Sequence, residues 1–86
     1  MQDRLAQTIR RYSGFRNWPD EVAQDIAALS VQVVPEKPEH HFAYCMGLTA
    51  TAISICDNYA ETGRIFYRDK RPFKLEQEIA LEGVAQ

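Results

Sequence analysis

Residues 38–63 read PEHHFAYCMGLTATAISICDNYAETG, and they predict the longest helix of the chain. Pro38 suits the first turn of a helix, where its missing N–H costs nothing, and Gly63 suits the position after the last turn, where a left-handed backbone is common. Gly47 is the main breaker between them, and a glycine costs only about 1 kcal/mol inside a helix. The interior is apolar nearly all round, which is typical of a helix surrounded by others. We therefore expect residues 38–62 to form one continuous central helix.

Two shorter helices are expected before the central one, over residues 2–12 and 19–30. In the first, Leu5 and Ile9 recur at helical spacing, and Ser13 with Gly14 provides a stop. The second begins at Pro19 and repeats apolar residues through Leu29. The β-branched residues at 31–34 fit either the end of that helix or a short strand.

The last part of the sequence predicts a link and then a fourth helix, which begins at Pro72 and ends at Gly83. The resulting fold class is all-α: a single compact four-helix domain over residues 1–86, built around the long central helix. The alternative is an α+β fold in which residues 31–34 and 64–68 pair as a short two-stranded hairpin, because Ile65, Phe66 and Tyr67 are good strand formers.

Composition favours one small folded domain. The chain has 86 residues, of which 45% are hydrophobic and 26% charged, with a net charge of −2. A disordered chain would be less apolar and more highly charged. The uncharged stretch at residues 42–56 is shorter than the roughly 20 residues that cross a bilayer, and the first residues lack the apolar block of a secretory signal. We expect no membrane association and a cytoplasmic location.

Residues suited to catalysis or metal binding are few. His41 and Cys45 share one face of the predicted helix, but zinc takes three or four ligands. Cys56 lies three turns further on, roughly 16 Å along the axis, which is too far for a disulfide with Cys45. The sequence has no glycine-rich phosphate loop and no nucleophile beside a base and an acid. These observations predict a protein that is not an enzyme and has no cofactor and no metal site.

Basic residues gather in the segment 64–74, which we call the basic segment. Arginine and tyrosine are favoured at the energetic centres of protein interfaces. We expect the partner-binding residues to be Arg64, Phe66, Tyr67, Arg68, Lys70 and Arg71. Cations interleaved with aromatic rings also suit nucleic acid, so the alternative is a nucleic-acid-binding transcriptional regulator that uses this segment. The negative net charge makes nucleic acid the weaker alternative.

Small residues form a stripe along the central helix: Ala43, Gly47, Ala50 and Ser54. Such a stripe lets another backbone come close, either a helix of the same chain or the same helix of a second copy. We take it as the candidate interface of a homodimer. The sequence as a whole indicates a small cytoplasmic, non-enzymatic protein–protein interaction or regulatory protein, an inhibitor or an adaptor, whose partner is another protein.

Overall fold

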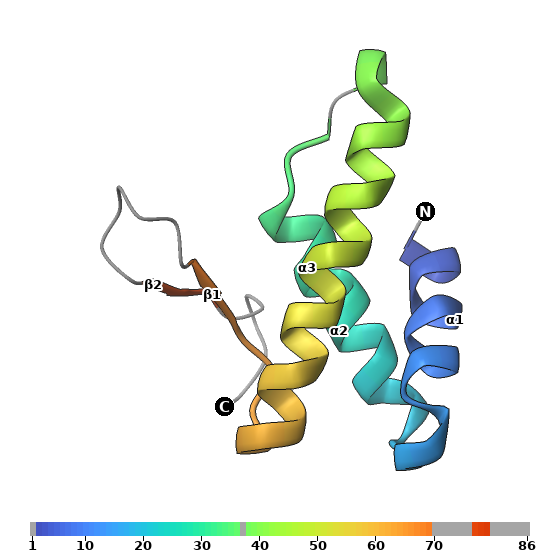
Figure 1. The fold of residues 1–86 in the computed structure, drawn as a ribbon, viewed down its shortest axis with the longest axis vertical. Helices are drawn as coiled ribbons and strands as arrows, with labels where there is room; N and C mark the ends of the chain where they lie inside the picture. Colours follow the sequence, from blue (N-terminus) through green and yellow to red (C-terminus); the bar gives the residue numbers. More distant parts are fainter. Residues whose placement is uncertain (1, 37, 70–76, 80–86) are drawn as a thin grey trace.

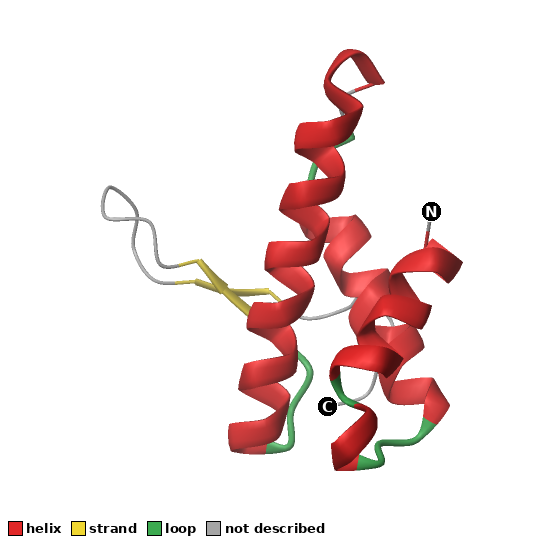
Figure 2. Cartoon of the chain, turned by 45° about the vertical axis from the view of Figure 1, so that its right-hand side comes forward, coloured by secondary structure: helices red, strands yellow, loops and turns green. Residues whose placement is uncertain are grey.

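The computed structural model describes residues 2–36, 38–69 and 77–79, and this part of the chain is mostly helical (Figure 1). The α-helices are α1 (Gln2–Tyr12), α2 (Asp20–Val33) and α3 (His41–Thr62). Two short 3-10 turns, η1 (Gly14–Arg16) and η2 (Pro38–His40), stand before α2 and α3. The strands β1 (Tyr67–Asp69) and β2 (Gln77–Ile79) pair antiparallel and lie on the side of α3 away from α1 (Figure 2).

The prediction of one long helix is confirmed. After the turn at η2, α3 runs without a break through Gly47 to Thr62. It ends at Gly63, whose φ of 75° is left-handed and whose N–H donates to the carbonyl of Tyr59 at 2.8 Å. Within the described residues, no helix combines the length and the hydropathy needed to cross a membrane.

The second helix is longer than predicted. Pro19 is its N-cap, and α2 continues past Ser30 to Val33. Val31 and Val33 are partly buried against the core, and the N–H of Val34 still donates to the carbonyl of Ser30 at 3.0 Å. The alternative hairpin between residues 31–34 and 64–68 is therefore wrong, because packing against the core outweighs the strand preference of β-branched residues.

The predicted fourth helix is not confirmed. Where it was expected, Gln77–Ile79 is a strand, and Tyr67 stands opposite Ile79 in the register with β1. The rest of that prediction, residues 72–76 and 80–83, lies outside the described residues. The segment offers only a few apolar positions, and a short helix without a broad apolar face to pack is marginal. A strand at 77–79 gains backbone hydrogen bonds with β1 instead.

The end of α1 also differs from the prediction. Gly14 does not adopt a left-handed backbone; it begins the 3-10 turn η1. The left-handed residue is Asn17, with a φ of 56°, and asparagine tolerates this conformation better than most side chains. The buried Ser13 hydroxyl donates to the carbonyl of Ile9 at 2.7 Å, which secures the last turn of α1.

The core lies where the three helices meet. α1 packs against α2, α2 packs against α3, and α1 also touches α3. Trp18 caps one end of the core, with its ring 4.8 Å from that of Tyr59 in an edge-to-face arrangement. The fully or nearly buried apolar side chains are Leu5, Ala6, Ile9, Val22, Ala23, Ile26, Ala27, Leu29, Leu48, Ala52, Ile55, Cys56 and Phe66.

Candidate functional site

Large apolar side chains are exposed on one side of α3 and on the neighbouring end of α1. Phe42 is 78% exposed, Met46 59%, Tyr12 40% and Ile53 37%. Positions 42, 46 and 53 lie four and seven residues apart, so they share one side of α3. Tyr12 lies against this side, because it lines the same hollow as Ile53. We call these four residues the apolar face.

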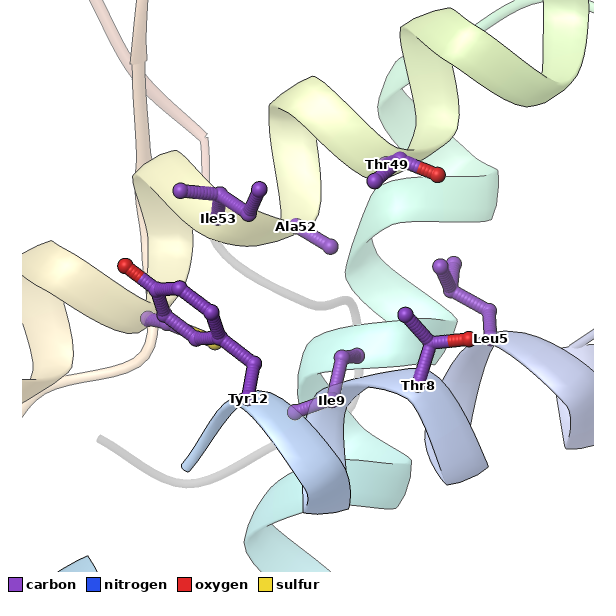
Figure 3. A pocket seen from close by; sticks show the side chains of 8 residues that line it. Leu5, Thr8, Ile9, Tyr12, Thr49, Ala52 and Ile53 are labelled. Atoms are coloured by element: carbon purple, nitrogen blue, oxygen red, sulfur yellow. The ribbon is translucent and has the colours of Figure 1, made fainter. Parts of the chain in front are cut away.

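A hollow of about 60 Å³ opens in this face between α1 and α3 (Figure 3). Its walls are apolar although two threonines line it. The hydroxyl of Thr8 donates to the carbonyl of Arg4 at 3.1 Å, and that of Thr49 donates to the carbonyl of Cys45 at 3.0 Å. Both hydroxyls point away from Ile53 and Tyr12 (Figure 3). The hollow is lined by Leu5, Thr8, Ile9, Tyr12, Thr49, Ala52, Ile53 and Cys56.

The apolar face is exposed because the helices differ in length and position. The first turns of α3 extend beyond the ends of α1 and α2 (Figures 1 and 2). The connection from α2 covers a different side of α3, since a Cβ added at Gly47 would lie 3.6 Å from a methyl carbon of Val34. Phe42 and Met46 therefore stand on an uncovered side of these turns, whereas Arg4 of α1 reaches the adjoining side and lines a pocket with His41 and Cys45.

The predicted small-residue stripe faces a different direction from the apolar face. Ala43, Ala50 and Ser54 are exposed, whereas Gly47 is half-buried beside Val34. The stripe thus lies partly on open surface and partly under the α2–α3 connection. It stays a prediction as a dimer interface.

Sequence analysis missed the apolar face. The signal was present in the spacing of Phe42, Met46 and Ile53 within an uncharged run. The run is apolar nearly all round, so the sequence indicates more apolar surface than the short helices can cover but not which side stays exposed. Only the relative positions of the helices show which apolar side of α3 stays uncovered.

The described part of the basic segment is built around Phe66, which is only 4% exposed. The guanidinium carbon of Arg64 lies 4.9 Å from the centre of the Phe66 ring, and that of Arg68 lies 5.7 Å from it. Asn58 donates its side-chain N–H to the carbonyl of Phe66 at 3.2 Å, which ties the segment to α3. Phe66 is therefore a support for two arginines, not an exposed ring for a partner.

The other predicted members of this site divide into two groups. Tyr67 is half-buried and packs against the core. Lys70, Arg71 and Lys74 lie outside the described residues. The structure thus brings together Arg64, Phe66, Tyr67 and Arg68 at the C-terminal end of α3.

The thiols and histidines have two different environments. Cys45 and Cys56 are free, and the Cys45 sulfur lies 3.6 Å from Nε2 of His41 on an exposed part of α3. Among the described residues, no group of three metal-ligating side chains comes together. Burial, with a smaller contribution from Asp57, raises the pKa of Cys56 from 9.0 to about 11. The thiol of Cys56 is consequently protonated at neutral pH and is a poor nucleophile.

Comparisons of the chain with protein-family models, curated proteins and solved structures find no match.

Proposed function

We propose that this chain is a small cytoplasmic protein that acts by binding other proteins, as an inhibitor or adaptor, and that it works as a homodimer without catalysing a reaction. The observation that supports this most directly is the apolar face. Monomeric proteins seldom expose several large apolar side chains together, and such patches often mark interaction sites. In this chain they stand on a regular helix beside an apolar hollow.

A second surface, at the basic segment, suits a protein partner. Arg64 and Arg68 both lie over the ring of Phe66, which restricts their side chains. An arginine that is already oriented loses less conformational entropy when it binds. Its planar guanidinium matches carboxylates in particular. We therefore propose that this end of α3 contacts an acidic surface of the partner, separately from the dimer contact.

The proposal is tested by affinity capture from a lysate of the native host, with the wild-type chain and two variants. Arg64→Glu/Arg68→Glu reverses the two charges, and Gln24→Glu adds a charge on an exposed position of α2 as a control. We expect one protein to be retained by wild type and by Gln24→Glu, lost with the double variant, and bound again when the purified proteins are mixed. Circular dichroism confirms that the variants are folded. Equal capture by all three chains, or capture of nothing above the empty matrix, contradicts the proposal.

The nucleic-acid alternative is tested on the same samples. Contacts to phosphates weaken steeply as salt rises. Fluorescence anisotropy with labelled single-stranded and duplex DNA should show no binding at low or at physiological salt. Binding that weakens with salt, and that the Arg64→Glu/Arg68→Glu variant abolishes, would favour the alternative.

A further inference from the structure

We infer that the apolar face binds a second copy of this chain, with the two α3 helices antiparallel and Met46 of each copy seated in the hollow of the other. The inference rests on the proposed function, because it specifies how the homodimer forms. It uses a different side of α3 from the small-residue stripe.

The lack of charge on this part of α3 is the first argument for a second copy. Residues 42–56 contain no Asp, Glu, Lys or Arg. A strongly charged partner would lose its hydration here and find no opposite charge, which is costly. A second copy brings an equally apolar surface to the contact. Charged groups adjoin this surface at Tyr12, whose hydroxyl donates to Asp57 at 3.4 Å and whose ring lies 6.0 Å from the guanidinium carbon of Arg16. Two identical surfaces related by a two-fold axis form a closed dimer.

The size of the hollow is the second argument. It measures about 60 Å³, well below the roughly 150 Å³ of an apolar cavity that takes up benzene. It therefore suits the end of an aliphatic chain better than an aromatic ring. Met46 is such a chain, and it is 59% exposed on the same helix. Methionine is flexible enough to fill irregular gaps.

The order of residues along α3 is the third argument. Positions 42, 46, 49 and 53 recur at intervals of three or four, which places them on one side of a helix, and Ala60 lies further along that side. The exposed Asp57 stands between Ile53 and Ala60 and marks the end of the uncharged part. An antiparallel pair centred between Thr49 and Ala50 places Met46 opposite Ile53 of the second copy. Phe42 then lies opposite Asp57 of the second copy, at the edge of the contact. The projecting end of each helix thus covers the end of the other that holds the hollow.

The position of α1 agrees with this arrangement. α1 lies beside the C-terminal half of α3, where it forms one wall of the hollow (Figures 1 and 3). A two-fold axis perpendicular to the two α3 helices brings α1 of the second copy to the same side of the pair. There it lies along the projecting turns of the first copy. Phe42 would then rest against Tyr12 of the second copy, and both exposed rings would be covered.

The exposed apolar area is small and fits a weak dimer. A large side chain offers roughly 150–250 Å² when fully exposed, so the four residues expose on the order of 400 Å² per chain. Two copies together bury about twice that area, before the adjoining threonines and alanines are added. Stable specific interfaces bury roughly 1,200–2,000 Å² in total. The four residues alone fall below this class, so we expect weak self-association, with a Kd of roughly micromolar order or higher.

The first experiment measures the mass of the full chain by sedimentation equilibrium across a series of concentrations. We expect twice the monomer mass at high concentration. Met46→Glu places a carboxylate in the apolar hollow and should raise the Kd by on the order of 100-fold or more. The control Gln24→Glu adds the same charge on α2 and should leave the Kd unchanged. A wild-type chain that stays monomeric at every concentration, or a Met46→Glu chain that still dimerises normally, overturns the inference.

Disulfide cross-linking tests the direction of the helices. In a Cys45→Ser background, Thr49→Cys lies near the two-fold axis and should form a disulfide with its counterpart on oxidation. Ala60→Cys lies on the same side of α3 far from the axis, so an antiparallel pair keeps the two thiols apart, beyond the roughly 7 Å that a disulfide spans. Cross-linking through Ala60→Cys would indicate parallel helices and overturn the inference.

These experiments distinguish failure of the second-copy inference from failure of the protein-partner proposal. Met46→Glu should still capture the protein partner through Arg64 and Arg68, although as a monomer. Loss of the dimer with retained capture contradicts only the second-copy inference. A dimer that captures no protein contradicts the partner proposal and leaves this inference standing.

Discussion

The two halves of α3 contain similar residues but have different surroundings. In the C-terminal half, Ile55 and Cys56 are buried among α1 and α2. In the N-terminal half Leu48 is buried too, but Phe42 and Met46 are largely exposed although they are just as apolar. The difference comes from the positions of the other helices, which cover only part of α3 (Figure 1). Residue type therefore indicates which surfaces prefer burial, whereas the arrangement of helices decides which of them are buried within one chain.

The largest expected effect is a loss of folding stability at Ile55, compared with a small loss at Ile53 on the opposite side of α3. Ile55 is fully buried, and Ile53 is 37% exposed on the apolar face. Ile55→Ala should lower the free energy of unfolding by about 2–5 kcal/mol, because it removes buried methyl groups and leaves a cavity. Ile53→Ala should cost about 1 kcal/mol or less. Urea unfolding at a protein concentration below the dimer Kd measures both.

Because Ile53→Ala and Ile55→Ala are matched, the difference between them reports the burial of the two side chains. Both substitutions replace the same residue type in the same helix, so helix propensity changes equally. Similar losses for the two variants would show that the side of α3 with Ile53 is also covered in the isolated chain. That result would contradict the division between a buried side and an exposed apolar face.

A second effect depends on pH and concerns the buried thiol. The pKa of Cys56 is raised from 9.0 to about 11, mainly by burial, so the folded chain binds its proton more tightly than the unfolded chain. Above pH 9 the unfolded state loses this proton first, and stability must fall as pH rises from about 9 to about 11. The stability advantage of wild type over Cys56→Ala should therefore be constant below pH 9 and shrink above it.

The measurement is urea unfolding of both chains at several pH values between 7 and 11. All other groups are common to both chains, so their contributions cancel in the difference. A difference that stays constant to pH 11 would show that the Cys56 thiol is not protected by the core.

Gly47 inside α3 and Gly63 directly after it should give a smaller pair of effects with opposite signs. Gly63 has a left-handed backbone, so Gly63→Ala should destabilise the fold by about 1–2 kcal/mol. Gly47 is inside the helix, and a Cβ there would meet Val34 at 3.6 Å, an ordinary contact distance. Gly47→Ala should therefore stabilise the fold by about 0.5–1 kcal/mol. Thermal unfolding of the two variants measures both signs. A destabilising Gly47→Ala would mean that α2 and α3 approach more closely there than the structure has them.

The parts of the fold that sequence could predict are those set by neighbouring residues. Pro38, Gly63 and the uncharged run between them define α3 locally, and this helix was predicted nearly to its ends. The strand at Gln77–Ile79 could not be found in this way, because it depends on pairing with Tyr67–Asp69. For the same reason α2 was predicted too short, since its last turn is held by contacts with distant residues.

In the candidate site, too, sequence predicted the local features but not those that depend on distant residues. Sequence located the basic segment, but it could not show that Phe66 is buried beneath Arg64 and Arg68. It also found the apolar character of α3 without finding which side stays exposed. That side depends on where α1 ends relative to α3, which is a long-range property of the packing.

The smallest expected effect is at Phe42, where the comparison between the two halves of α3 predicts almost none. Its side chain is 78% exposed, so Phe42→Ser removes little buried area from the isolated chain. The free energy of unfolding should stay within about 0.5 kcal/mol of wild type at low protein concentration. At high concentration the variant should lose the extra stability that dimerisation gives to wild type, because binding of a second copy favours the folded state. Urea unfolding at two protein concentrations tests both statements. A large loss at low concentration would show that Phe42 packs within its own chain, and the two halves of α3 would then be equally covered.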